Sequence, residues 1–240
     1  MYWLSYGGGV NSTALAVLMV RNQLPQYDPW RIIFADTGCE KPQTYEYIGD
    51  HFSPWLIKHG KILEIVKPQE SVLERWERYS VTGSRRIRAC TYHGKVLPIQ
   101  NYIIQNGVGG VEIIGIHAGE EHRQPNKIRP LVNAGIDQAG CVEIIKAEGL
   151  PVPVKSGCWC CPFARVSEVI ELSRRYPCMF ARIERLEQSA TEKHGLDKYG
   201  RVRTHWADRP ASYWRERAKQ QVLFDDYPDI ELPCGCYDGE

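Results

Sequence analysis

Several common signatures are missing from this sequence of 240 residues. No apolar run approaches the ~18 to 20 residues that cross a bilayer. The first residues show no basic stretch followed by an apolar segment, as a secretory signal would. The net charge is only +1, so the basic excess of proteins that coat nucleic acids is also missing. These absences favour a cytoplasmic globular protein with no membrane partner, and they leave room only for a local basic patch.

Cysteine, in contrast, is abundant. The chain has nine cysteines, an odd number. Without a secretory signal, they are better interpreted as thiols or metal ligands than as disulfides. The apolar fraction of 43% is ordinary for a globular protein and sufficient for a buried core. The length suits one large domain, or one domain with a small appendage.

Strand-like and helix-like segments alternate over the first part of the chain. Strands are predicted at Trp3–Ser5, Arg31–Asp36, Lys61–Val66 and Val111–Ile116, with a short fifth at Ile128–Val132. Helices are predicted at Asn11–Asn22, Pro42–His59, Leu97–Gln105 and Asp137–Glu148. This alternation is typical of a doubly wound parallel sheet with helices on both faces. We therefore expect an α/β nucleotide-binding domain over residues 1–155.

The character of the sequence changes after about residue 155. Cysteines, aromatic residues and charges cluster there, and strand signals fade. The segment Glu168–Ser189 has a helical pattern, with a bend or break expected near Pro177. We expect residues 156–240 to form a cysteine-rich, mainly helical region packed on the first domain.

Polar residues follow three of the predicted strands. A glycine loop follows the first strand, Asp36-Thr37-Gly38 follows the second, and His117–Arg123 follows the fourth. Parallel sheets bind their ligands at the carboxyl ends of their strands. The three loops are therefore expected to form one site. In it, Arg123 suits a phosphate or sulfate, with Glu120 holding that arginine or a metal; a surface salt bridge is the alternative.

The glycine loop reads Ser5-Tyr6-Gly7-Gly8-Gly9-Val10-Asn11-Ser12-Thr13. Glycines let the backbone turn tightly and approach a ligand. The free N–H groups and dipole at the start of the following helix favour an anion. Hydroxyls of Ser5, Ser12 and Thr13 can add hydrogen bonds. Taken alone, an ordinary strand-to-helix turn explains the loop equally well, and the loop matches neither the Walker pattern nor Gly-x-Gly-x-x-Gly.

Five short segments together resemble the adenine nucleotide alpha hydrolases, also called N-type ATP pyrophosphatases, and within them the phosphoadenosine phosphosulfate (PAPS) reductase-like proteins. The segments, in the order in which such proteins show them, are Ser5–Thr13, Phe34–Gly38, Arg88–Thr91 with Lys95 and Pro98, Gly115–Glu120 with Arg123, and Gly157–Phe163. The resemblance implies a Rossmann-like fold of the HUP type. It also implies that ATP or a related adenine nucleotide is bound.

The resemblance assigns roles to individual residues. Phosphates would lie at the glycine loop (Ser5, Gly7, Gly8, Gly9, Asn11, Ser12 and Thr13), and the ribose or base would lie at Asp36, Thr37 and Gly38. Asn11, Glu120 and Arg123 would be the catalytic residues. The usual loop of the family reads Ser-Gly-Gly-x-Asp-Ser, whereas this chain has Gly7 and Asn11 in place of the serine and the aspartate. Losing that carboxylate weakens the expectation of a magnesium ion, and Ser5 would supply the missing hydroxyl.

Cys158 and Cys161 have the Cys-x-x-Cys spacing that lets two thiolates meet one metal centre, although a redox dithiol is also consistent with it. Similar proteins carry a cysteine at the position of Cys90 and often a terminal pair. The resemblance therefore implies a centre ligated by Cys90, Cys158, Cys161 and Cys236, with Cys234 as the alternative fourth ligand. Four thiolates fit a [4Fe-4S] cluster, which we favour, or zinc.

Three functions are consistent with these features. The first is an enzyme, a transferase or oxidoreductase of sulfur transfer or sulfonucleotide chemistry, with a sulfur donor or thiol-reductant protein as partner. Its tail, Leu232-Pro233-Cys234-Gly235-Cys236, departs from the Glu-Cys-Gly-Leu-His setting of the usual PAPS reductase. The second is an ATP-dependent, thiolation-type enzyme acting on nucleic acid, suggested by basic and aromatic residues near Cys90 and over residues 201–217. The third is a non-catalytic nucleotide- and metal-binding module.

Overall fold

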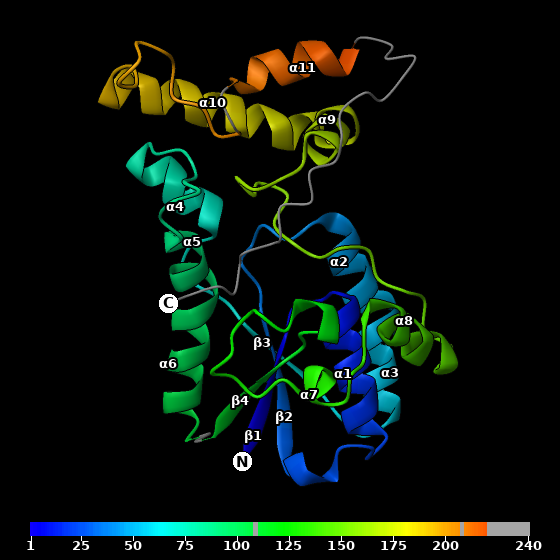
Figure 1. Ribbon diagram of the computed structural model, residues 1–240. Coiled ribbons are helices and arrows are strands. Elements are labelled where there is room, and N and C mark those ends of the chain that lie inside the picture. The colour runs from blue at the N-terminus through cyan, green and yellow to red at the C-terminus, as the bar shows by residue number, and fades with distance from the viewer. Residues whose placement is uncertain (108–109, 207–208, 220–240) are drawn as a thin grey trace. The chain divides into compact units, whose positions relative to one another are not determined.

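The computed structural model describes residues 1–107, 110–206 and 209–219 (Figure 1). These residues form two compact units. Among the described residues, the first consists of Met1–Gln69 and Thr91–Cys158, and the second consists of Glu70–Cys90 and those between Trp159 and Lys219. The predicted division into residues 1–155 and 156–240 stays a prediction. The units follow contacts in space, and the second contains residues 70–90 as well.

The first unit contains a four-stranded parallel sheet. Its strands are β1 (Tyr2–Tyr6), β2 (Trp30–Ala35), β3 (Leu63–Val66) and β4 (Val111–Ile114), arranged in the order β3-β2-β1-β4. In the register of the sheet, Leu4 of β1 lies beside Ile32 on one side and Ile113 on the other. The central strands are apolar at nearly every position because a parallel sheet is covered on both faces.

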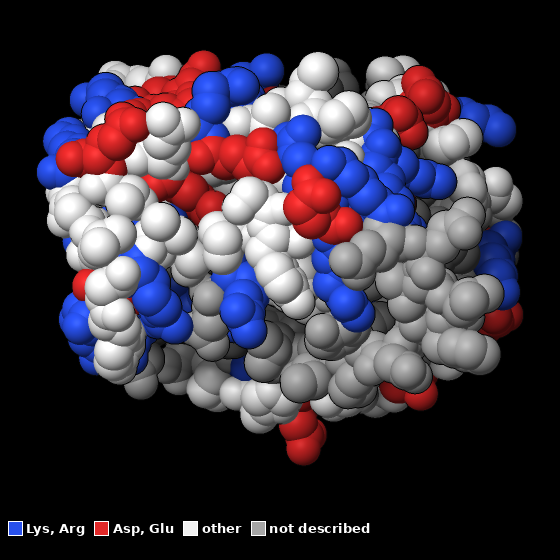
Figure 2. Space-filling model, turned by 90° about the horizontal axis from the view of Figure 1, so that it is seen from above, with Lys and Arg blue, Asp and Glu red and all other residues white. Residues whose placement is uncertain are grey.

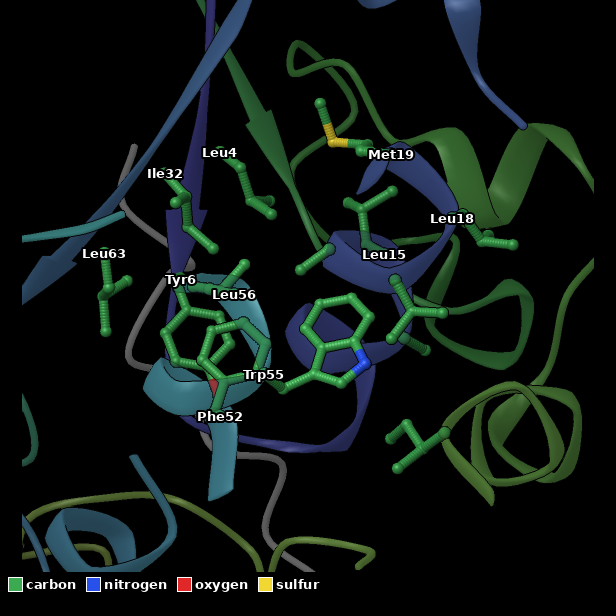
Figure 3. Packing of buried hydrophobic residues seen from close by; sticks show 14 of the residues in the cluster. Leu4, Tyr6, Leu15, Leu18, Met19, Ile32, Phe52, Trp55, Leu56 and Leu63 are labelled. Atoms are coloured by element: carbon green, nitrogen blue, oxygen red, sulfur yellow. The ribbon is translucent and has the colours of Figure 1, made fainter. Parts of the chain in front are cut away.

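Helices cover both faces of the sheet (Figure 1). One face packs against α1 (Val10–Val20), α2 (Pro42–Glu46), a π-helical segment (Tyr47–Phe52), α3 (Ser53–Lys58) and α8 (Gln138–Ala147). The other face packs against α6 (Leu97–Gln105) through a smaller cluster of Trp3, Ile33, Ala35, Val66 and Ile99. Figure 3 shows the larger cluster, in which the stacked rings of Tyr6 and Phe52 lie 4.2 Å apart. The predicted α/β doubly wound fold is confirmed.

Short elements connect these layers. They are the 3-10 helices Pro25–Tyr27 and Ala118–Glu120, α5 (Ala89–Thr91), the π-helical segment Tyr92–Val96 and α7 (Pro130–Asn133). The predicted fifth strand at Ile128–Val132 is wrong. Ile128 makes a single parallel bridge to Ile113, and then Pro130 begins α7. Proline has no N–H to donate to a sheet, and its fixed φ suits the first helical position.

The second unit is helical, as the sequence predicts. Its helices are α4 (Val72–Tyr79), α9 (Val166–Arg175), α10 (Pro177–His194) and α11 (Ala211–Lys219), and the expected break falls at Pro177. Phe180, Ile183 and Leu186 of α10 are fully buried. The sequence analysis missed α4, although its capping box of Ser71 and Glu74 is a start signal. Among the residues that the structure describes, no helix is long and apolar enough to cross a membrane.

Candidate nucleotide-binding site

Three loops meet at the carboxyl edge of the sheet in the first unit. They follow β1, β2 and β4, and they carry Gly7–Gly9, Asp36–Gly38 and Gly115–Arg123. All four strands are parallel, so the ends of these strands lie at one edge, where open α/β sheets bind ligands. The structure therefore brings together the loops that the sequence proposed for one site.

The glycine loop is tightly packed on one side and open on the other. Gly8 has φ +72°, and a Cβ there would lie 2.7 Å from Cγ2 of Thr44. A Cβ on Gly9 would lie 2.8 Å from Oγ of Ser156. Gly7, in contrast, has only Oγ of Ser12 within 4 Å of the position of a Cβ, at 3.9 Å. The loop thus requires glycine at position 8, a side chain at position 9 would displace the hydroxyl of Ser156, and position 7 has space.

Helix α1 begins at this loop without a side-chain cap. Gly9 occupies the N-cap position, and no side chain accepts a hydrogen bond there. Oγ of Ser12 accepts from the N–H of Gly7 at 3.2 Å and donates to the carbonyl of Gly9 at 3.1 Å, so this hydroxyl shapes the loop. An uncapped helix start offers N–H donors and a positive dipole end to an anion.

Two further hydroxyls of the predicted phosphate site point elsewhere. Thr13 is fully buried, and its Oγ1 lies 3.1 Å from the hydroxyl of Tyr6. Ser5 is buried within β1. Burial raises the pKa of the Tyr6 hydroxyl well above its ordinary value, so Tyr6 stays neutral. Backbone N–H groups are therefore the main donors that the start of α1 presents.

The loop after β4 lies directly against the start of α1. A Cβ on Gly115 would lie 2.7 Å from both N and Cα of Ser12, so only glycine permits this approach. Nδ2 of Asn11 donates to Glu120 at 3.4 Å, and Nη1 of Arg123 donates to Glu120 at 2.6 Å. Nε2 of His117 lies 3.6 Å from the same carboxylate. The three predicted catalytic residues thus form one hydrogen-bonded group.

One atom of this group is notable. Oδ1 of Asn11 is buried and has no hydrogen-bond partner within the described residues. A buried polar atom without a partner costs free energy, and such atoms concentrate at sites where a ligand or ion completes the bonding. The amide oxygen is therefore an acceptor position available to a ligand hydroxyl, a water molecule or a cation.

The loop after β2 is held by its own side chains. Asp36 accepts hydrogen bonds from the N–H of Gly38 at 2.9 Å and from the hydroxyl of Tyr45 at 2.6 Å. Nζ of Lys67 lies 3.3 Å from its other oxygen. Burial and the bond to Asp36 raise the pKa of Tyr45 above its ordinary value, so the phenol remains a donor. The predicted ribose-side carboxylate is thus held in place by Gly38, Tyr45 and Lys67.

A buried charged group lies behind this loop, and the sequence analysis missed it. Glu40 is only 1% exposed, and its Oε1 lies 3.3 Å from Nζ of Lys95 and 3.1 Å from Oγ1 of Thr37. The thiol of Cys158 lies 3.3 Å from Thr37 and 3.8 Å from Glu40. Burial, followed by the negative charge of Glu40, raises the pKa of Cys158 well above its ordinary value. The segment Thr37-Gly38-Cys39-Glu40 contains no pattern that indicates this pairing with a distant lysine.

The predicted metal ligands are only partly described. Cys158 lies in the first unit, Cys90 and Cys161 lie in the second, and Cys234 and Cys236 fall outside the described residues. Within the described residues, no three side chains of the metal-binding types gather into a metal site, and no disulfide joins their cysteines. The four-thiolate ligand set therefore stays a prediction.

The second unit holds its cysteine segment by hydrogen bonds from one short stretch. Nε2 of His205 lies 2.8 Å from the carbonyl of Cys160, and Nε1 of Trp206 donates to the carbonyl of Cys161 at 2.9 Å. Burial lowers the pKa of His205 to about 4, so the ring is neutral and donates from Nε2. The backbone of the Cys-x-x-Cys segment is thus fixed from behind.

Comparisons with known proteins agree with this description. A family model of the phosphoadenosine phosphosulfate reductase domain matches residues 1–132. The uncharacterized protein MJ0066 of Methanocaldococcus jannaschii is 23% identical over 238 residues, covering 91% of this chain and 46% of its own length. The chain therefore spans about half the length of this curated relative.

Two solved structures are similar to this chain. One is a PAPS reductase from Candida auris in complex with phosphate, which is 19% identical with a TM-score of 0.49 and covers 66% of this chain and 81% of its own. The other is the U34-tRNA thiolase NcsA from Methanococcus maripaludis with its [4Fe-4S] cluster, which is 14% identical with a TM-score of 0.47 and covers 90% of this chain and 80% of its own.

Proposed function

Because the chain belongs to the phosphoadenosine phosphosulfate reductase family, we propose that it binds ATP or a related adenine nucleotide at the carboxyl edge of its sheet. The observation that carries the proposal is the uncapped start of α1 beneath the glycine loop, with the unpartnered amide oxygen of Asn11 beside it. Phosphates bind at the N–H groups of this helix start. Gly7, Gly8 and Gly9 would form the cradle, Ser12 would shape it, and the hydroxyls of the predicted Ser5 and Thr13 would not take part.

The roles of the catalytic residues follow from charge. Arg123 and Asn11 both contact the carboxylate of Glu120. The planar guanidinium of Arg123 can donate two hydrogen bonds to one oxyanion. Glu120 keeps Arg123 and Asn11 oriented. Charge that develops on a departing phosphate or sulfite would be stabilised by Arg123 and the helix start together. This suits a transferase or oxidoreductase acting in sulfur transfer or sulfonucleotide chemistry.

Asp36, Thr37 and Gly38 would contact the sugar or base. Tyr45 and the N–H of Gly38 fix one oxygen of Asp36, so its carboxylate is already oriented when the nucleotide arrives. A ribose hydroxyl would donate to the remaining lone pairs of this carboxylate. A magnesium ion, if required for binding, would have the amide oxygen of Asn11 as an oxygen ligand, which suits a hard cation.

We further propose that Cys90, Cys158, Cys161 and Cys236 hold a [4Fe-4S] cluster, with zinc as the alternative. Cys158 is partly buried, and its thiol lies 3.8 Å from Glu40, which is paired with Lys95. The cation of Lys95 would offset part of the negative charge of a thiolate centre. The cluster would supply redox or sulfur-binding chemistry when bound. Anaerobic purification with metal analysis tests it. Iron with absorbance near ~400 nm supports a cluster, and zinc supports the alternative. A protein that contains neither iron nor zinc would overturn the proposal.

The nucleotide proposal is tested by calorimetric titration with ATP and PAPS, together with an assay for released pyrophosphate. Asn11→Ala should weaken binding about tenfold, the size of one lost hydrogen bond to a charged group. Asn101→Ala is the matched control, because Asn101 is exposed on α6, away from the loops. Absence of binding for both nucleotides to metal-replete protein would refute the proposal.

A nucleotide-binding module without catalysis is the alternative function. The observation that favours it is Asn11, which supplies an amide where the usual loop of the family has a carboxylate. Tight nucleotide binding without release of pyrophosphate or reduction of PAPS, in the presence of a thiol reductant and candidate acceptors, would support the module over the enzyme.

A further inference from the structure

The second unit contains a basic pocket that the nucleotide site does not use. Its volume is about 700 Å³, which lies within the range of sites that take small molecules. Three arginines and two histidines contribute to its lining, and no aspartate or glutamate does. The complete lining is Val81, Thr82, Gly83, Ser84, Arg85, Arg86, Ile87, His194, Arg203, Thr204 and His205.

The charges of this pocket differ from those of the surrounding unit. Elsewhere in the unit, arginines pair with carboxylates: Arg182 with Glu77 at 2.7 Å and Arg215 with Glu184 at 2.6 Å. Figure 2 shows acidic and basic side chains side by side over much of one face of the molecule. Within the described residues, Arg86 forms no ion pair, and the contacts of Arg85 and Arg203 are to carbonyl oxygens and one aromatic ring.

The pocket is held in shape by its own backbone. The N–H of Gly83 donates to Nδ1 of His205 at 3.0 Å, and a Cβ on Gly83 would lie 2.8 Å from that ring. Oγ of Ser84 accepts from the N–H groups of Arg86 and Ile87, both at 3.1 Å. The hydroxyl proton of Ser84 thus remains available to a ligand. This turn leaves Arg86 exposed at the rim of the pocket.

Arg85 is prepositioned, while Arg86 is not. Nε of Arg85 donates to the carbonyl of Pro162 at 2.9 Å, and its guanidinium lies 5.9 Å from the ring centre of Phe163. Arg203 donates to the carbonyls of Gly195 and His194 at the end of α10, at 2.9 and 3.0 Å. Two guanidinium groups held by carbonyl oxygens and a third without such a bond, in a lining without a carboxylate, favour an anion with several oxygens.

We propose that this pocket binds a phosphate carried on a nucleotide unit, either a free nucleotide or one unit of a single strand. Its volume exceeds the needs of a bare phosphate, which is why we assign a nucleotide. A solvated basic turn with no ligand is the alternative, and the binding test separates the two.

The test measures binding of a fluorescent oligouridine by anisotropy over a range of salt concentrations. Uridine is used so that the adenine site is not the one being filled. Arg86→Ala should weaken binding about fivefold at low salt and flatten the slope of log affinity against log salt by about 0.7, the value for one phosphate contact on a single strand. Arg86→Lys should retain most of that slope.

Arg175→Ala is the matched control, because Arg175 is an exposed arginine of the same unit outside the pocket, 3.1 Å from Glu171. Equal effects of the Arg86 and Arg175 variants, or absence of oligouridine binding together with absence of uridine monophosphate binding, overturn the proposal. Displacement of the oligomer by uridine monophosphate at similar concentration identifies a free nucleotide as the ligand. Failure of that displacement identifies a single strand.

The outcome is separable from that of the proposed function. ATP binding with no binding of uridine ligands rejects the pocket alone. Binding of oligouridine that depends on Arg86, with no binding of ATP or PAPS, supports the pocket as a phosphate site and rejects the nucleotide site of the first unit.

Discussion

Each compact unit has one buried glutamate among the residues that the structure describes, and the two glutamates are stabilised differently. Glu40 of the first unit is 1% exposed and lies 3.3 Å from the ammonium of Lys95. Glu187 of the second unit is 5% exposed and accepts the backbone N–H groups of His205 at 2.6 Å and Ala211 at 2.7 Å. No ion pair to Glu187 is found within the described residues.

The pKa of Glu187 reflects this difference. Burial raises it to about 7, against the lowering effect of its two backbone donors. The first unit therefore keeps a charged pair beside a thiol and a ligand edge, whereas the second uses a carboxylate that is easily protonated to fasten a loop. The comparison suggests that Glu40 and Lys95 serve the site, and that Glu187 serves the fold.

Lys95→Met should have the largest effect. It leaves Glu40 buried without its cation, which typically costs about 3–5 kcal/mol of unfolding free energy. Urea denaturation at neutral pH measures the loss. The double variant Lys95→Met/Glu40→Gln should regain at least half of it, because the uncompensated charge is gone. A single variant within about 1 kcal/mol of the parent would show that this pair is not the main support of Glu40.

Glu187 should make stability depend on pH in a defined window. Its pKa is raised in the folded state, so the folded protein binds more protons, and its contribution falls as pH rises from about 4.5 to about 7. The full span corresponds to about 3 kcal/mol. Glu187→Gln cannot titrate. The amide nitrogen of the variant cannot accept one of the two backbone N–H groups, so the variant should be less stable than the parent below this window. Its unfolding free energy relative to the parent should then rise by up to ~3 kcal/mol across the window.

The measurement is the difference in unfolding free energy between Glu187→Gln and the parent at several pH values. A difference that stays constant from acid to neutral pH would show that burial does not perturb this carboxyl. The control is Glu184→Gln. Glu184 lies on the same helix as Glu187, is more accessible, and pairs with Arg215 at 2.6 Å. That variant should show no rise in relative stability over the window.

The secondary structure and the loops of the site could be predicted from the sequence, whereas the charge pairs between distant residues could not. The strands, α1 and the three loops follow from apolar periodicity and from glycines, which act locally. The pairing of Glu40 with Lys95 depends on how β2 and the π-helical segment Tyr92–Val96 come together in space. Likewise, Arg85 and Arg86 were visible in the sequence as basic residues. The sequence did not reveal that, within the described residues, they have no carboxylate partner, or that Arg203 joins them in the pocket. Long-range charge pairing leaves no periodic signal in a single sequence.

The smallest losses of stability are expected on removal of one threonine hydroxyl in each unit. Oγ1 of Thr37 donates to the buried carboxylate of Glu40 at 3.1 Å, whereas Oγ1 of Thr191 donates to the carbonyl of Glu187 at 2.8 Å. Hydrogen bonds to charged groups contribute about 1.5–3 kcal/mol, and those between neutral groups about 0.5–1.5 kcal/mol. Thr37→Val should therefore destabilise the protein by about 2 kcal/mol and Thr191→Val by about 1 kcal/mol, measured by urea denaturation.

The two threonine variants also differ in what they should do to the thiol of Cys158. Thr37 lies 3.3 Å from that sulfur, so Thr37→Val should change the rate at which a thiol reagent modifies Cys158, followed by mass spectrometry. Thr191→Val should leave that rate unchanged, because Thr191 bonds to backbone groups of the second unit. Equal losses of stability, with no change at Cys158, would mean that Glu40 is not held as a charged acceptor. In that case Glu40 and Glu187 would not differ in the way proposed, because Thr37, which contacts both Glu40 and Cys158, would behave like Thr191.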